Sequence, residues 1–86
     1  CEDITQIKPN PEGYLTAAHE LQISPEDCLV LEDAETGVIA GKKAGMRVIG
    51  VKNNGDQNLS FADITVDELR ELVNKDKEFW VRVFTP

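Results

Sequence analysis

A short apolar run that ends in two acidic residues constrains the fold of this chain more than any other feature. The run Cys28–Leu31 is followed directly by Glu32 and Asp33, and residues 34–44 then have the spacing of a helix. A second apolar run follows at Arg47–Val51. The order strand, helix, strand with short connections is typical of a parallel βαβ unit. The sequence therefore predicts an α/β domain with a parallel sheet.

Helix signals support this interpretation on both sides of the first strand. Asn10 followed by Pro11 has the residue types of a helix cap and of a first helical position. The helix predicted over 34–44 carries Gly37 and Gly41 on one face. A glycine inside a helix costs roughly 1 kcal/mol relative to alanine. Two of them indicate that this helix approaches the sheet closely.

The C-terminal third is predicted with less regular elements. Ile64–Val66 is typical of a short third strand, and Asp67 can cap a helix over 68–73. Alternation from Phe79 to Phe84 predicts a strand, although the pattern gives it no place in the sheet. We therefore predict that residues 1–74 are part of a core domain and that residues 75–86 are a C-terminal extension.

Composition excludes several classes of protein. The 86 residues carry 16 acidic and 9 basic side chains, a net charge of −7, which argues against non-specific nucleic-acid binding. No apolar run approaches the ~20 residues of a membrane span, so no membrane partner is expected. The two cysteines, Cys1 and Cys28, form neither a disulfide framework nor a metal cluster. A cytoplasmic setting is expected.

The acidic pair is the first candidate for a functional site. Ligands of open α/β sheets bind beyond the carboxyl ends of the strands, and an ionised carboxylate there favours a partner or a metal. Glu32 and Asp33 are therefore candidates for a cation site. The alternative is that the pair only caps the following helix and interacts with its dipole.

Several segments in the same order resemble a known family. They are Ile7–Glu12, Cys28–Asp33, Gly37 and Ala44–Met46. In this combination the chain resembles the C-terminal part of a haloacid-dehalogenase-superfamily hydrolase of the phosphatase and β-phosphoglucomutase-like branch. The resemblance covers about residues 3–72. It implies the C-terminal half of a Rossmann-like, three-layer domain with a parallel sheet, without the nucleophile strand and the cap.

The resemblance also implies site residues and a cofactor. Lys8 matches the catalytic lysine that neutralises developing negative charge, Asp33 matches a Mg²⁺ ligand and Glu32 its acidic neighbour. Magnesium prefers oxygen ligands, and together with the lysine it would screen an anionic nucleophile from a phosphoryl group. The expected parent is a magnesium-dependent phosphatase acting on a small phosphorylated metabolite, such as a sugar phosphate.

Two alternatives stay open. The parent could instead be a phosphomutase of the β-phosphoglucomutase type, or the chain could be a non-catalytic remnant or assembly module. The family's Asp-x-Asp nucleophile motif lies upstream of the matching region, so the chain is expected to be a C-terminal fragment that is inactive alone. Without the nucleophile strand, Cys28–Leu31 would lie at an unpaired sheet edge, which predicts poor stability, self-association or the need for a partner segment.

Overall fold

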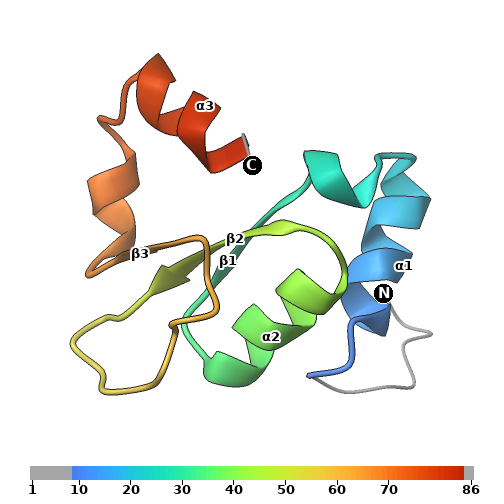
Figure 1. The fold of residues 1–86 in the computed structure, drawn as a ribbon, viewed down its shortest axis with the longest axis horizontal. Helices are drawn as coiled ribbons and strands as arrows, with labels where there is room; N and C mark the ends of the chain where they lie inside the picture. The colour runs from blue at the N-terminus through green and yellow to red at the C-terminus, as the bar shows by residue number, and fades with distance from the viewer. Residues whose placement is uncertain (1–8, 85–86) are drawn as a thin grey trace.

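The computed structural model describes residues 9–84, which form a small sheet with helices around it (Figure 1). In chain order the elements are α1 (Glu12–Leu21), the 3₁₀ turn η1 (Pro25–Asp27), β1 (Leu29–Glu32), α2 (Glu35–Lys43), β2 (Arg47–Val51), β3 (Ile64–Val66), the 3₁₀ turn η2 (Leu69–Leu72) and α3 (Lys77–Phe84). Within the described residues, no helix is long and apolar enough to cross a membrane.

The three strands form one parallel sheet in the order β1-β2-β3. Val30 of β1 pairs with Val48 of β2, and Ile49 of β2 pairs with Ile64 of β3. The predicted strand–helix–strand unit is therefore confirmed, with α2 as the crossover between β1 and β2. The third predicted strand is confirmed at its predicted residues.

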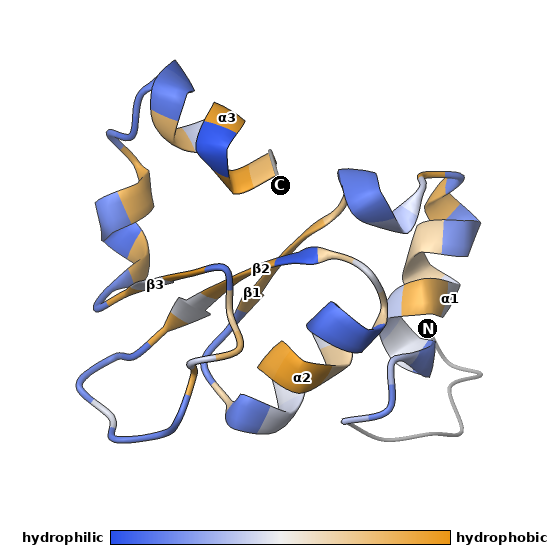
Figure 2. Cartoon of the chain, viewed as in Figure 1, coloured by the Kyte–Doolittle hydropathy of each residue, from blue (hydrophilic) through white to orange (hydrophobic). Residues whose placement is uncertain are grey.

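Alternate residues of the strands face two separate apolar layers. One cluster joins the sheet to α1 and α2 and contains Ala18, Val30, Val38, Ala44, Met46, Val48 and Leu59. The other joins the sheet to α3 and contains Ile49, Val51, Val66 and Val83, with Phe79 and Trp80 packed against it. Hydrophobic colour follows β1 and β2, whereas the connection between β2 and β3 is mostly hydrophilic (Figure 2). The sheet is thus the middle layer of three, as the resemblance implied.

The helix signals in the N-terminal half are confirmed by contacts. The Glu12 N–H donates to Asn10 Oδ1 over 2.8 Å, so the Asn10 side chain binds the first N–H of α1, although Pro11 and not Asn10 occupies the cap position. A Cβ atom added at Gly41 would lie 2.7 Å from Cγ2 of Val48, a fully buried side chain of β2. Since real Cβ atoms do not approach so closely, Gly41 is what lets α2 lie directly on the sheet.

The helix predicted over 68–73 is wrong in type and in its cap. Residues Leu69–Leu72 form a single 3₁₀ turn, and Glu68 occupies the cap position in place of Asp67. The Glu68 N–H donates to the Glu71 carboxylate over 2.7 Å. A six-residue helix is marginal unless its apolar face is buried. Here Val73 stays 78% exposed, so the packing that would extend the turn is missing.

The strand predicted over Phe79–Phe84 is also wrong, because these residues belong to helix α3. Asp76 Oδ1 accepts a hydrogen bond from the Phe79 N–H over 3.0 Å, the geometry of a helix cap. Val83 is buried, and Phe79 and Trp80 pack beside it in an edge-to-face pair with ring centroids 5.0 Å apart. The apolar side chains thus also fit a helical spacing, and contact with the sheet selects it. The division of the chain at residue 74 stays a prediction.

Asp63 ties the long β2–β3 connection to the rest of the sheet. Its Oδ2 accepts from the Val48 N–H over 2.8 Å, and Lys42 Nζ of α2 lies 2.9 Å from the same oxygen. Burial raises the pKa of Asp63, but the Val48 hydrogen bond and the Lys42 ammonium lower it by more in total. The charge of Arg47 adds to this lowering, so the pKa of Asp63 lies below its ordinary value.

This lowered pKa predicts an acid-sensitive contribution to stability. The contribution is fully present above the pKa of an unfolded aspartate, about 3.9, and is lost as the pH falls through the folded-state value. We expect Asp63→Asn to lower the free energy of unfolding at pH 6 and to flatten its fall between pH 6 and pH 3, measured by urea denaturation. The control Asp56→Asn removes an exposed carboxylate from the same connection. An equal flattening in the control would contradict this role for Asp63.

Candidate functional site

The two acidic residues lie where the parallel strands end. Glu32 is the last residue of β1, and Asp33 follows it in the turn into α2. A pocket of about 450 Å³ opens at this edge, lined by Leu31, Glu32, Asp33, Val51, Asn53 and Leu69. The structure therefore brings both predicted metal ligands to one pocket at the carboxyl ends of β1 and β2, which is where open α/β sheets bind ligands.

The helix-cap alternative is wrong for this pair. The cap position of α2 is Ala34, which has extended backbone dihedrals and no side-chain hydrogen bond to the helix. Its carbonyl accepts from the Val38 N–H, so α2 begins with backbone contacts only. Neither Glu32 nor Asp33 occupies the cap position of the helix, whereas the interaction of the two carboxylates with the helix dipole stays a prediction.

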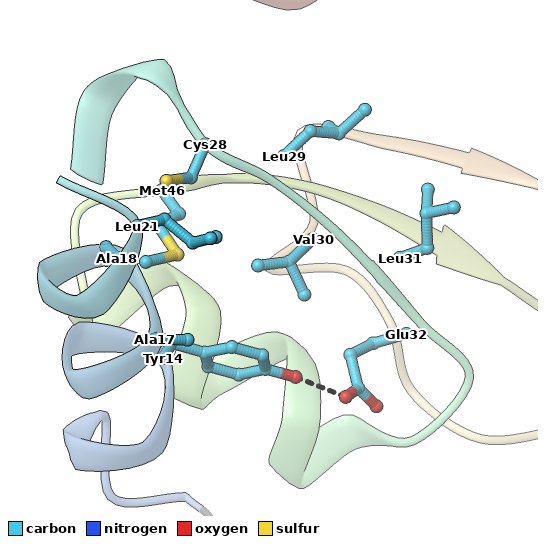
Figure 3. A pocket seen from close by; sticks show the side chains of 10 residues that line it. All are labelled: Tyr14, Ala17, Ala18, Leu21, Cys28, Leu29, Val30, Leu31, Glu32 and Met46. Carbon is cyan, nitrogen blue, oxygen red and sulfur yellow. Dashed lines mark hydrogen bonds between the residues drawn. The ribbon is translucent and has the colours of Figure 1, made fainter. Parts of the chain in front are cut away.

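The Glu32 carboxylate is held between two helices. The Tyr14 hydroxyl of α1 donates a hydrogen bond to Glu32 Oε2 (Figure 3). Gly37 of α2 lies against the same carboxylate, since a Cβ atom at Gly37 would overlap its atoms. Glu32 is half-buried in this position. The sequence contains no local pattern that indicates contact between the Tyr14 hydroxyl and the acidic pair.

Asp33 differs from its neighbour because its side chain is exposed. Among residues 9–84, no hydrogen bond or ion pair to its carboxylate is present. Its main chain is fixed instead, because the Asp33 carbonyl accepts from Nε2 of Gln57 over 2.7 Å. Sequence reasoning missed Gln57, which lies 24 residues along the chain in a polar connection that predicts only a turn.

The donors at this edge suit a hard divalent cation. Magnesium is commonly held by one or two carboxylates, with water and substrate phosphate completing its shell. The exposed Asp33 carboxylate fits this requirement directly, and Glu32 lines the same pocket. Within residues 9–84 there is no group of three or more His, Cys, Asp or Glu side chains that could hold a metal by themselves. A metal here would therefore need additional oxygen ligands.

Lys8, the predicted catalytic lysine, lies outside the described residues. Its role stays a prediction that follows from the family resemblance. The roles of Glu32 and Asp33 as metal ligands also stay predictions, now with a defined position at the sheet edge.

Comparison with known proteins identifies the family. The sequence model of haloacid dehalogenase-like hydrolases matches residues 1–51. The chain is 45% identical over 65 residues to β-phosphoglucomutase of Bacillus subtilis, covering 76% of this chain and 28% of that protein. It is 38% identical over 73 residues to validoxylamine A 7'-phosphate phosphatase of Streptomyces hygroscopicus, covering 84% of this chain and 34% of that protein. The chain belongs to the haloacid dehalogenase-like hydrolases.

Solved structures confirm the fold. The crystal structure of β-phosphoglucomutase from Clostridium difficile superposes with a TM-score of 0.81 at 31% identity, covering 96% of this chain and 35% of that one. The chain is thus similar over most of its length to about a third of each of these relatives, and it belongs to their phosphatase and β-phosphoglucomutase-like branch.

The contact between Tyr14 and Glu32 generates a stability prediction. We expect Tyr14→Phe to lower the free energy of unfolding by about 1–2 kcal/mol, because a partly buried carboxylate loses a hydrogen-bond donor. Combining it with Glu32→Gln in a double-mutant cycle should give a coupling energy of about 0.5–3 kcal/mol in urea denaturation. Strictly additive effects of the two substitutions would show that this contact contributes nothing.

Proposed function

We propose that this chain supplies the metal-binding part of a magnesium-dependent phosphatase that cleaves a small phosphate monoester, such as a sugar phosphate. The observation that carries the proposal is the pocket at the carboxyl edge of the sheet, where the exposed Asp33 and the half-buried Glu32 lie together in a chain of the hydrolase family. The phosphatase named among the relatives, which acts on a phosphorylated small molecule according to its name, supports this reaction class.

Each residue has a separate role in this proposal. Asp33 and Glu32 would hold Mg²⁺, and the Tyr14 hydroxyl and Gly37 keep the Glu32 carboxylate in place. A bound Mg²⁺ supplies positive charge that offsets the negative charge of a phosphoryl group. Lys8 adds a second positive charge for the same purpose. The printed sequence contains no Asp-x-Asp motif. We therefore propose that the chain is inactive in isolation.

A phosphomutase is the second candidate, favoured by the identity to β-phosphoglucomutase. In that case the phosphoryl group would pass to a second sugar phosphate in place of water. Incubating the whole protein with β-glucose 1-phosphate distinguishes the two reactions, since a phosphatase releases inorganic phosphate and a mutase forms glucose 6-phosphate. Absence of both products, over a range of phosphate esters, would favour the non-catalytic alternative.

The site residues can be tested in the whole protein. We expect Asp33→Asn and Lys8→Ala each to reduce kcat by about 10²–10³, because Lys8→Ala removes a positive charge that acts on the phosphoryl group and Asp33→Asn removes a ligand of the Mg²⁺ that supplies another. The matched control is Asp27→Asn, an exposed carboxylate in η1 just before β1 begins, and it should keep the parent rate. Measurement of phosphate release at saturating Mg²⁺ decides this. Unchanged turnover in Asp33→Asn or Lys8→Ala would remove that residue from the proposed site.

We propose further that the isolated chain self-associates through β1. Within the described residues β1 pairs only with β2, so its outer edge is open. A groove of about 420 Å³ lies along this edge beside α1, with Tyr14, Leu21 and Val30 in its lining (Figure 3). Leu31 of β1 is 46% exposed. Parallel strands are normally covered, and an open apolar edge favours pairing with another chain.

Sedimentation velocity tests this association. We expect the isolated chain without substitutions to form dimers or larger species as its concentration rises. Leu31→Lys should shift the chain toward monomer, because charge at a strand edge opposes pairing. The control Val73→Lys introduces the same charge at a position 78% exposed that lies after η2. A parent that stays monomeric and unfolds in one cooperative transition would contradict the proposal.

A further inference from the structure

One side-chain amide joins the tips of two strands next to the acidic pair. Nε2 of Gln57 donates to the Asp33 carbonyl over 2.7 Å and to the Lys52 carbonyl over 3.1 Å. Asp33 follows β1 and Lys52 follows β2, whereas Gln57 belongs to the connection between β2 and β3. A single half-buried side chain therefore links three segments at the edge where the pocket opens.

The amide occupies the place where the strand ladder stops. The last pair between β1 and β2 is Glu32 with Gly50, and Asp33 then turns away into α2. Beyond this pair the main chain of Asp33 has left the ladder. The Gln57 amide contacts the carbonyls of Asp33 and Lys52 just beyond the last pair, so it continues the link between the ends of the two strands.

The turn that precedes Gln57 determines where the side-chain amide of Gln57 lies. Asn53 and Asn54 have positive φ values of 50° and 63°, and the Gly55 N–H donates to the Lys52 carbonyl over 2.8 Å, which closes a tight turn. Lys52 Nζ in turn donates to the Gln57 carbonyl over 2.6 Å. A Cβ atom at Gly55 would collide with Gln57 Oε1. Turn, lysine and glycine together fix where the Gln57 side chain lies.

The two contacts also require an amide and not a carboxylate. Both partners are carbonyl oxygens, which only accept hydrogen bonds, so the NH₂ group must face them. A glutamate at position 57 would place a charged oxygen against two carbonyl oxygens. Glutamine and glutamate have almost the same shape, so this exchange isolates the hydrogen bonds from packing.

We propose that Gln57 is a positioning residue for the candidate metal site: its amide fixes the main chain of Asp33 and so holds the exposed carboxylate at the pocket. The inference rests on the proposed metal-binding role of Asp33. A ligand that is already held in place binds with a smaller loss of conformational freedom. Residues that orient metal ligands typically affect metal affinity about 10–100-fold when they are changed.

The test uses Mn²⁺ as a paramagnetic probe and the ¹⁵N-labelled whole protein, which supplies the additional oxygen ligands that the site needs. In the parent, titration with Mn²⁺ should broaden the amide signals of Asp33 and its neighbours at the pocket. We expect Gln57→Glu and Gln57→Ala to weaken this binding about 10–100-fold. The extra negative charge of Gln57→Glu would by itself attract the cation more strongly. A weaker affinity in that variant therefore reports lost positioning, and the uncharged alanine variant gives an independent measurement.

Asn58→Asp is the matched control. It adds the same charge one residue further along, while its side-chain oxygen can still accept the Ser60 N–H, a bond now 3.0 Å long. We expect this control to bind Mn²⁺ at least as tightly as the parent. All affinities are measured without denaturant, with urea denaturation confirming that each variant is folded.

The outcomes separate the two proposals. Parent-like Mn²⁺ affinity in both folded Gln57 variants would overturn the positioning role and leave the metal site standing. If Asn58→Asp loses as much affinity as Gln57→Glu, the loss is not specific to the hydrogen bonds of Gln57, and the role is again overturned. If Mn²⁺ does not broaden the signal of Asp33 in the parent, the metal site fails, and the inference about Gln57 fails with it.

Discussion

The backbone ladder between β1 and β2 is the interaction on which the rest of this structure depends. Four consecutive residue pairs, from Leu29 with Arg47 to Glu32 with Gly50, align the two strands. This register places Val30 beside Val48 on the side that α2 covers. It also brings the ends of both strands to one edge. A shift of one residue would turn the buried side chains to the opposite face and separate the acidic pair from the β2 tip.

Helix α2 can cover this ladder only because of its small residues. Gly41 lets the helix backbone reach Val48, and Gly37 leaves space for the Glu32 carboxylate. The same helix therefore seals the core at one end and shapes the candidate site at the other. This double use connects stability with function, since a larger side chain at Gly37 would displace a proposed metal ligand rather than a core residue.

The long connection between β2 and β3 adds two polar attachments at opposite ends of β2. Asp63 binds the Val48 N–H and Lys42 near the strand's beginning, and Gln57 binds the Asp33 and Lys52 carbonyls beyond its end. Leu59 lies between them and is buried in the core. The connection contains no helix or strand, and it is held in place by the buried side chain of Leu59 and by the hydrogen bonds of Asp63 and Gln57. The position of this connection matters because the connection borders the pocket that contains the proposed metal site.

The sequence by itself determined the parallel α/β unit, because the apolar runs, the helix-start signal at Asn10 and the glycines of α2 are local signals that all agree. It also located Glu32 and Asp33 at a strand tip, since that position follows directly from where an apolar run stops. Only the tertiary structure decided that residues 79–84 form a helix, because their apolar pattern fits either period until Val83 packs on the sheet. It alone decided that Tyr14 and Gln57 reach the acidic pair. Those contacts join residues 18 and 24 positions apart, and no local pattern specifies which distant polar side chains will meet once the core has packed.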